Sequence, residues 1–381
     1  MMKLLALFTL VFAISCGTVG TASPSASPST APTASASPSA SAIALAGSTL
    51  SMAAEREMVS FHADRGALIA SSTKDSPPPY DSKIWRADPP GGPWRTIYAS
   101  DAMFLVDRVS AGRIGFIEYR EQYQGGGAYS NIFVVLDLTT GRKTEIDRFA
   151  LTAATYHGGG GGPRRPTGTM ALGPDFVAWT RLVEGPGGTM TGELRVAPVA
   201  DPAASQLVAR SAEWLRPLAI DAHRLVYVLG GTTADTLHVR DVESGTDKVI
   251  ATGPVGNTSL GAVPGWDFAA VSGDWLVWLE NAKAPTTTAH AMSLVSGDQR
   301  TVDVGGSGCV GPSAGTRYFT WTCSKQSASD PQPLTILDAK TLDLVKPIPL
   351  GTGVGTIAMD DGLLWFNVVG SGRTVTFFRP N

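Results

Sequence analysis

The chain has 381 residues, 43% of them hydrophobic, and a net charge of −3. This length allows one large domain or two of ordinary size. The near-neutral charge argues against a nucleic-acid-binding protein, which would have a basic stripe or a high pI. With 43 Gly and 26 Pro, the composition favours a turn-rich globular protein.

The first residues have the pattern of an export signal. Lys3 precedes an apolar run, Leu4 to Ile14, that is shorter than the roughly 20 residues of a membrane span. The run ends in Ala13-Ile14-Ser15-Cys16. This end resembles the lipobox of bacterial lipoproteins, in which the Cys is diacylated, although the family usually has Leu where this chain has Ala13. We therefore predict a lipoprotein signal peptide over residues 1–15; the alternative is an ordinary secretory signal with a chance Cys.

A spacer follows the signal. From Thr18 to Ser41 the sequence is almost wholly Ser, Ala, Pro and Thr, without charged or aromatic residues. Such a segment buries too little apolar surface to offset its ordering entropy, so residues 16–43 are predicted to be a disordered linker. Two or three acyl chains (palmitate-type) on Cys16 would anchor it stably, because one chain binds only marginally. The expected location is the extracytoplasmic face of the cell membrane.

A nine-residue phrase recurs through the rest of the chain, and each copy reads as a short strand, a tight turn and an apolar strand with an aromatic end. The spacing is mostly about 43 to 51 residues, the period of a four-stranded β-propeller blade. The aromatic ends are Phe116, Trp179, Tyr227, Trp278, Trp321 and Trp365. Their place inside an apolar strand predicts that they pack between sheets; a sugar-stacking ring is the alternative.

A second strand pair follows each copy, which predicts an all-β, seven-bladed β-propeller over residues 44–381, with six or eight blades as alternatives. The last unit ends at Asn381 without a fourth strand. Ala44 to Met52 is the predicted strand that completes it, which would also remove an exposed sheet edge. Tandem sandwiches do not explain one period kept from about residue 60 to the end.

The turns complete the resemblance to a known fold family. Asp137 to Gly141 and Asp241 to Gly245 have an Asp-x-x-x-Gly pattern. Together with the repeated phrase, they make the domain similar to the WD-repeat-like and TolB-type propellers of exported bacterial proteins. That resemblance implies scaffolding or recognition and names no ligand.

Three Cys are present. If Cys16 is lipidated, Cys309 and Cys323 remain as an even pair in an oxidising compartment. They flank the turn around Ser313 to Thr316, so we expect them on adjacent antiparallel strands and joined by a disulfide; two free thiols are the alternative. Neither has a His or second Cys at ligand spacing, so no metal site is predicted there.

The longest loops are predicted on one face of the propeller, where binding residues concentrate. Two of them, around blade two, are rich in Tyr, Arg and Gly, the first two being frequent anchors of recognition surfaces. The candidate binding residues are Tyr119, Arg120, Tyr123, Tyr129, Tyr156, His157, Arg164 and Arg165. The alternative is a solvated insertion with incidental polar residues. Gly158 to Gly162 lacks the Lys-Ser/Thr of a P-loop.

No catalytic signature is found. The chain has no Gly-x-Ser-x-Gly elbow, and its histidines form no metal-binding pair: His62, His157, His223, His238 and His290. Glu118 and Glu280 end equivalent strands, but blades two and five lie across the ring, too far apart for glycosidase chemistry. No catalytic residue, metal or cofactor is predicted.

The sequence therefore predicts a non-catalytic recognition or scaffold module, monomeric and membrane-anchored, that binds protein, peptide or glycan and no nucleic acid. The alternative is an envelope hydrolase or lyase with its site in the propeller funnel.

Overall fold

A computed structural model describes much of the domain after the linker. The described residues are 45–51, 57–73, 80–88, 92–120, 129–151, 169–186, 189–213, 215–254, 269–280, 288–303, 307–315, 318–324, 333–349, 365–369 and 374–380. All of them belong to one unit, Ser41–Asn381. The predicted signal peptide, Cys16 and the linker lie outside the described residues.

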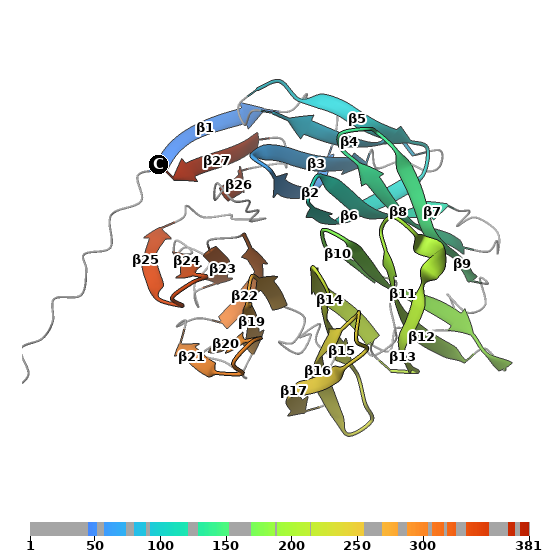
Figure 1. The fold of residues 1–381 in the computed structure, drawn as a ribbon. Coiled ribbons are helices and arrows are strands. Elements are labelled where there is room, and N and C mark those ends of the chain that lie inside the picture. The colour runs from blue at the N-terminus through green and yellow to red at the C-terminus, as the bar shows by residue number, and fades with distance from the viewer. Residues whose placement is uncertain are drawn as a thin grey trace, which may run out of the picture. The chain divides into compact units, whose positions relative to one another are not determined.

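The described residues form seven antiparallel sheets, which follow one another along the chain (Figure 1). The first sheet comprises β2 (Glu57–Asp64), β3 (Ala67–Thr73), β4 (Ser82–Ala87) and β5 (Arg95–Ser100). The second comprises β6 (Met103–Ser110), β7 (Arg113–Arg120), β8 (Tyr129–Asp137) and β9 (Lys143–Leu151). The third comprises β10 (Thr169–Leu172), β11 (Phe176–Glu184), β12 (Met190–Pro198) and β13 (Gln206–Ser211), with a 3-10 turn, η2 (Pro202–Ala204), before β13.

The next three sheets repeat this order. The fourth comprises β14 (Leu215–Asp221), β15 (Arg224–Leu229), β16 (Ala234–Asp241) and β17 (Asp247–Pro254). The fifth comprises β18 (Ala269–Ser272), β19 (Trp275–Glu280), β20 (Thr288–Ser293) and β21 (Gln299–Asp303). The sixth comprises β22 (Ser307–Ala314), β23 (Tyr318–Ser324), β24 (Pro333–Asp338) and β25 (Leu344–Pro349).

The seventh sheet joins the two ends of the domain. Its order is β1 (Leu45–Ser51), β27 (Thr374–Pro380) and β26 (Trp365–Val369). β1 pairs with β27 over its full length, from Leu45 opposite Pro380 to Ser51 opposite Thr374. The predicted closure by an N-terminal strand is confirmed. Residues 350–364, where the sequence places the first strand of this sheet, lie outside the described residues, so the blade count stays a prediction.

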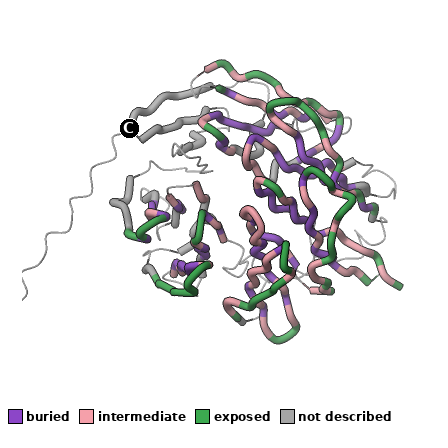
Figure 2. Tube along the Cα trace, in the orientation of Figure 1, coloured by how far each residue is buried: buried purple, intermediate pink, exposed green. Residues whose placement is uncertain are grey.

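The hydrophobic core lies between neighbouring sheets. The first strand of each of the first five sheets packs against the first strand of the next, as β2 does against β6 and β10 against β14. Buried residues cluster at each boundary; between the second and third sheets they include Phe133, Phe149 and Trp179. Figure 2 shows buried residues along the inner strands and exposed ones along outer strands such as β5, β13 and β17. The second, third, fourth and fifth sheets therefore bury both faces against their neighbours.

The repeated aromatic residues belong to this core, as predicted. Phe116, Trp179, Tyr227, Trp278 and Trp321 are all at most 4% exposed. The side chain of Trp365 lies outside the described residues. A sugar-stacking ring is therefore wrong for the five described aromatics.

Two kinds of tight turn share one edge of the sheets. In the second sheet, Leu138 of the β8–β9 turn donates its backbone N–H to Gly112 of the β6–β7 turn at 2.9 Å. The fourth sheet repeats this bond from Val242 to His223 at 2.7 Å. The longer connections leave from the opposite ends of the strands, which we call the long-loop edge.

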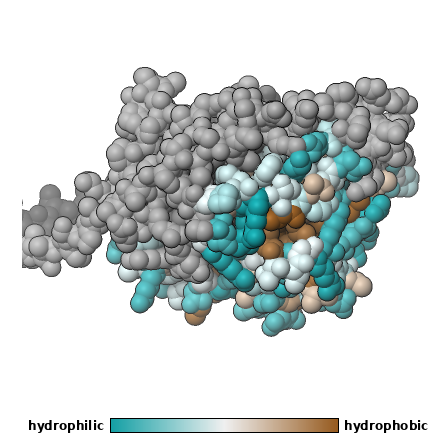
Figure 3. Space-filling view, turned by 90° about the horizontal axis from the view of Figure 1, so that it is seen from above, coloured by the Kyte–Doolittle hydropathy of each residue, from teal (hydrophilic) through white to brown (hydrophobic). Residues whose placement is uncertain are grey.

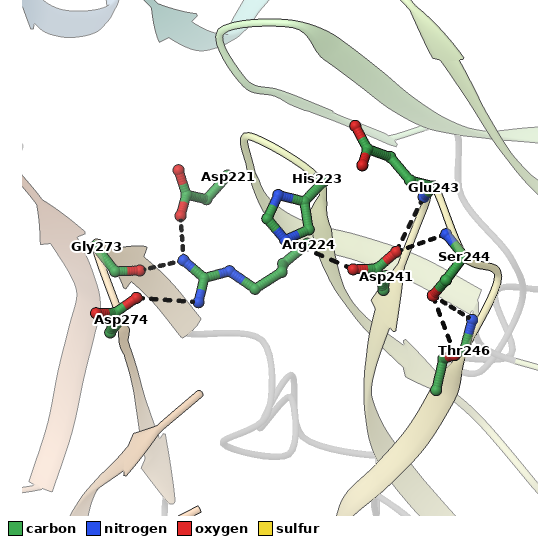
Figure 4. A network of polar contacts seen from close by, with 9 residues as sticks. All are labelled: Asp221, His223, Arg224, Asp241, Glu243, Ser244, Thr246, Gly273 and Asp274. Carbon is green, nitrogen blue, oxygen red and sulfur yellow. Dashed lines mark hydrogen bonds and ion pairs between the residues drawn. The ribbon is translucent and has the colours of Figure 1, made fainter. Parts of the chain in front are cut away.

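Side chains at the tight-turn edge connect successive sheets. Arg65 donates to the carbonyl oxygen of Ala111 at 2.8 Å, and Arg113 donates to that of Pro174. Arg224 donates to the carbonyl oxygen of Gly273 and lies 3.5 Å from the carboxylate of Asp274 (Figure 4). Each arginine reaches the turn of the following sheet, so these contacts tie neighbouring sheets together.

The described surface is largely polar. Figure 3 shows hydrophilic side chains over most of the coloured face, with hydrophobic atoms in a recess between them. Among the described residues, no helix is long and apolar enough to cross a membrane.

Candidate recognition site between the second and third sheets

A cluster of charged side chains lies where the second sheet meets the third, toward the long-loop edge. Arg181 stands three positions before the end of β11, and Arg210 stands one position before the end of β13. Glu193 on β12 is the register partner of both. Side chains directly opposite one another on adjacent strands share a face of the sheet, so the three side chains meet. On the facing sheet, Asp147 of β9 approaches Arg181.

Glu193 is the centre of the cluster. Its side chain is 6% exposed. One carboxylate oxygen, Oε2, accepts from Arg181 Nε at 2.9 Å and lies 2.9 Å from Nη2. The other, Oε1, accepts from Arg210 Nε at 2.9 Å and lies 2.8 Å from its Nη2. A carboxylate offers about four acceptor sites. Each oxygen therefore accepts a hydrogen bond from one arginine, with a second nitrogen of the same guanidinium group in ion-pair contact.

The charge on Glu193 is stabilised by these partners. Burial by itself raises the pKa of a carboxyl group, but hydrogen bonds and charges from Arg181 and Arg210 outweigh it. The pKa of Glu193 is consequently lower than its ordinary value. The carboxylate thus stays ionised and holds both guanidinium groups in fixed orientations.

A third arginine, Arg195, remains without a close acceptor on this carboxylate. It follows Glu193 by two positions on β12, on the same face, and its Nη1 lies 3.7 Å from Glu193 Oε2. Its side chain is 22% exposed, and that of Arg210 is 63% exposed. Asp147 accepts at 2.7 Å from Trp179 Nε1, and its Oδ2 lies 3.9 Å from Arg181. Three guanidinium groups thus face two carboxylates, which leaves one positive charge at a partly exposed site.

An apolar floor lies under this cluster. Trp179, which donates to Asp147, packs with Phe133 and Phe149 of the second sheet. Tyr119, Leu182 and Met190 are partly buried against the same core. The site thus combines fixed cationic groups with a rigid hydrophobic support.

The structure brings part of the predicted binding surface to this place. Tyr119 lies next to the end of β7 and packs against the core beneath the arginines. Arg120 ends β7 and Tyr129 begins β8, but their side chains lie outside the described residues. The other candidate binding residues lie entirely outside the described residues: Tyr123, Tyr156, His157, Arg164 and Arg165. The segments 121–128 and 152–168 leave the second sheet from the ends of β7 and β9.

Sequence reasoning missed Asp147, Arg181, Glu193, Arg195 and Arg210 as site residues. The alternation of charges in Glu193-Leu194-Arg195 was a usable signal, because alternate residues of a strand share a face. The partners on β9, β11 and β13 are distant in sequence, and only strand register and sheet packing bring them together.

A second polar cluster lies between the first and second sheets. Glu118 of β7 is fully buried and pairs with Lys143 Nζ at 2.7 Å. Tyr98 of β5 donates to the same carboxylate oxygen. Burial and the bond to Glu118 raise the pKa of Tyr98 above its ordinary value. Glu118 therefore forms an ion pair with Lys143 inside the second sheet and accepts a hydrogen bond from Tyr98 of the first. Glu280 belongs to the fifth sheet.

A third cluster surrounds His238 in the fourth sheet. Its Nδ1 lies 3.1 Å from Asp247 Oδ1 and its Nε2 lies 2.9 Å from Thr236 Oγ1, a connectivity like that of a hydrolase triad. The ring stacks on Tyr227 with centroids 4.6 Å apart. His290 stacks on Trp278 in the same way in the next sheet, at 5.0 Å. A stack repeated in consecutive sheets indicates a packing role.

Two of the histidines belong to the fourth sheet. His223 lies in the turn between β14 and β15, 3.5 Å from Asp241 (Figure 4). His238 lies within β16. In the part of the chain that the structure describes, no group of three His, Cys, Asp or Glu residues is arranged to hold a metal ion. Cys309 of β22 is the register partner of Cys323 of β23, which confirms the predicted adjacency. Their disulfide stays a prediction.

Comparisons with known proteins show the fold. No protein-family profile matches the chain, and no curated protein is similar in sequence. An oligogalacturonate lyase from Vibrio parahaemolyticus is similar in structure with a TM-score of 0.52 at 9% identity, over 88% of this chain and 97% of that one. An acylaminoacyl peptidase from Pyrococcus horikoshii has a TM-score of 0.51 at 10% identity, over 82% of this chain and 49% of that one. TolB from Acinetobacter baumannii has a TM-score of 0.42 at 11% identity, over 83% of this chain and 64% of TolB.

The likenesses to the lyase and the peptidase, together with the repeated four-stranded sheets, show a β-propeller fold, as predicted. The chain spans about half the length of the peptidase and 64% of the length of TolB. At such identities the likeness concerns the fold alone.

Proposed function

We propose that this protein is an exported lipoprotein whose β-propeller is a non-catalytic recognition or scaffold module for a protein, peptide or glycan. The observation that supports this most is the arginine cluster around Glu193. It lies at the edge from which the segments 121–128 and 152–168, with Tyr123, Tyr156, Arg164 and Arg165, leave the second sheet. Fixed guanidinium groups on a rigid scaffold suit recognition of an anionic partner.

Capture of a partner from envelope extract tests this function. We expect the purified domain to retain a partner that is lost when residues 158–163 are deleted and Arg164 and Arg165 are replaced by Ala. The melting temperature should stay nearly unchanged, because loop residues add little to sheet packing. The control is Arg142→Ala, an exposed residue of the β8–β9 turn at the tight-turn edge. Equal capture by both variants would place the site elsewhere.

An envelope hydrolase or lyase is the alternative function. The lyase and the peptidase of similar fold show that enzymes also have such propellers. The same purified domain, incubated with envelope polysaccharide and peptide substrates, distinguishes the two functions. Turnover that persists in the loop variant would favour an enzyme with its site in the funnel.

Membrane attachment through Cys16 is part of this proposal. Mass spectrometry of the mature protein should find acyl chains on Cys16, and Cys16→Ser should release the protein from membranes. We also propose a disulfide between Cys309 and Cys323, which are directly opposed on β22 and β23 and so are within the Cα separation that a disulfide needs. Non-reducing peptide mapping should recover the two peptides linked.

A further inference from the structure

Arg195 and Arg210 have unused hydrogen-bonding capacity, and their side chains are 22% and 63% exposed. Each guanidinium group has five N–H donors. Arg210 uses its Nε and Nη2 on Glu193, while Arg195 approaches that carboxylate only at 3.7 Å. Glu193 already accepts hydrogen bonds from Arg181 and Arg210, one at each carboxylate oxygen. An incoming carboxylate would therefore meet one arginine held in place, Arg210, and one without a close partner on Glu193, Arg195, and it would neutralise the excess positive charge.

The positions of the two arginines define a spacing. Glu193 is opposite Arg210 in the register of β12 and β13, and Arg195 is two residues further along β12. Arg195 and Arg210 are thus diagonal neighbours, for which Cα separations are about 7–8 Å. In an extended peptide, side chains at alternate positions point to the same side and lie about 6.6 Å apart. Carboxylates at positions i and i+2 of such a peptide match this spacing.

We propose that the ligand is an acidic peptide segment in extended conformation, with Asp or Glu at alternate positions, one carboxylate meeting Arg195 and the next meeting Arg210. This inference rests on the proposed recognition function. β13 is the outermost strand of its sheet, so an extended segment has a free edge beside Arg210 along which to lie. Glu193 is then a positioning residue: it holds Arg210 in place without touching the ligand.

Binding of synthetic peptides to the purified domain tests this. The probe is a fluorescein-labelled decapeptide of alternating Glu and Thr, measured by fluorescence anisotropy in buffer of low ionic strength. Its controls are the matching Gln/Thr peptide and a block peptide of five Glu and five Thr. We expect the alternating peptide to bind at least about tenfold more tightly than the Gln/Thr peptide, because bonds between charged groups are the strong ones. It should also bind more tightly than the block peptide.

Variants of the domain test whether Arg195 and Arg210 bind the peptide. Arg195→Gln and Arg210→Gln should each weaken binding of the alternating peptide about tenfold, whereas Arg142→Gln should leave it unchanged. Glu193→Gln should weaken binding less than either, since it loosens Arg210 but removes no cation. Added salt at 150 mM should reduce the binding of wild type more than that of Arg195→Gln.

Three outcomes would overturn the inference. They are equal binding of the Glu and Gln peptides, unchanged binding by both arginine variants, and arginine-dependent binding of a polyuronate without binding of the peptide. The last would assign the site to an acidic glycan. In all three, loss of partner capture in the 158–163 deletion would still support the recognition function, so the two failures are distinguishable.

Discussion

At the scale of single residues, Glu193 has the largest concentration of charge contacts in the described chain. Its carboxylate accepts hydrogen bonds from Arg181 and Arg210, and the guanidinium group of Arg195 lies 3.7 Å away. We expect Glu193→Gln to lower the free energy of unfolding by about 2 kcal/mol. That is less than the roughly 3–5 kcal/mol for breaking a fully buried pair, because both arginines are partly exposed. Urea unfolding of wild type and Glu193→Gln at pH 7 measures this loss of stability. The control is Glu145→Gln in the exposed pair with Arg148, worth about 0–1 kcal/mol.

The same carboxylate predicts a pH dependence. The pKa of Glu193 is lower in the folded protein. Its contribution is therefore complete above its unfolded pKa of about 4.3 and is lost as the pH falls through the folded value. The stability gap between wild type and Glu193→Gln should shrink below about pH 4. A constant gap down to pH 2 would contradict this.

The contribution of Tyr227 to stability depends on pH in the opposite direction, since it is lost at alkaline pH. Burial and its hydrogen bond to Asp247 raise the pKa of Tyr227 well above its ordinary value. Tyr227→Phe should cost about 1–2 kcal/mol at pH 7. The contribution is fully present below the unfolded pKa of about 10 and declines as the pH rises beyond it. The difference from wild type should therefore narrow above about pH 10 in urea unfolding, and a widening difference would refute the assignment. Tyr80→Phe, outside this cluster, is the control.

At the scale of elements, the turns decide how neighbouring sheets meet. Gly112 in the β6–β7 turn has φ +78, and an added Cβ would lie 2.8 Å from the Arg65 guanidinium that bridges to this turn. Gly141 in the β8–β9 turn has a similar φ of +69 with nothing within 4 Å. Gly141→Ala should cost about 1 kcal/mol, from the left-handed backbone alone.

Gly112→Ala should cost more than Gly141→Ala, by about 0.5–1.5 kcal/mol, because it also displaces the Arg65 bond to Ala111. Thermal unfolding of the two single variants measures the difference. In an Arg65→Ala background the difference should disappear, because the side chain that the new methyl group meets is gone. Equal costs in the wild-type background would show that the contact contributes nothing to stability.

At the scale of the whole molecule, the closing strand ties the start of the domain to its end. β1 pairs with β27 over seven residues. A chain that starts at residue 52 should lose about 5 kcal/mol, from several backbone hydrogen bonds of about 1 kcal/mol each. It should also aggregate through the exposed edge of β27. Thermal unfolding and light scattering measure both effects.

The control for closure is a chain that starts at residue 44. It lacks the predicted signal and linker but keeps β1, so its melting temperature should equal that of the mature protein. A chain that starts at residue 52 and melts like this control would show that the β1–β27 pairing does not stabilise the domain.

The sequence by itself determined the repeated elements of this protein. Alternating apolar residues with an aromatic end predict Trp179 and Tyr227 in the core, and Asp-x-x-x-Gly predicts turns whose Asp137 accepts backbone N–H groups from Thr139 and Thr140. These features depend on a few adjacent residues, so a local pattern is enough to reveal them. The unpaired last unit likewise indicated closure by the N-terminal strand.

Only the tertiary structure decided the site. Glu193 and Arg210 meet because of strand register, and Asp147 approaches Arg181 because the third sheet packs its Trp179 face on the second. A shift of one residue in register would turn Arg210 to the opposite face. A local sequence pattern does not determine which of the many surface charges become neighbours in the folded protein. The ionic contacts therefore follow from packing between sheets, whereas the sheets themselves follow from the sequence repeat.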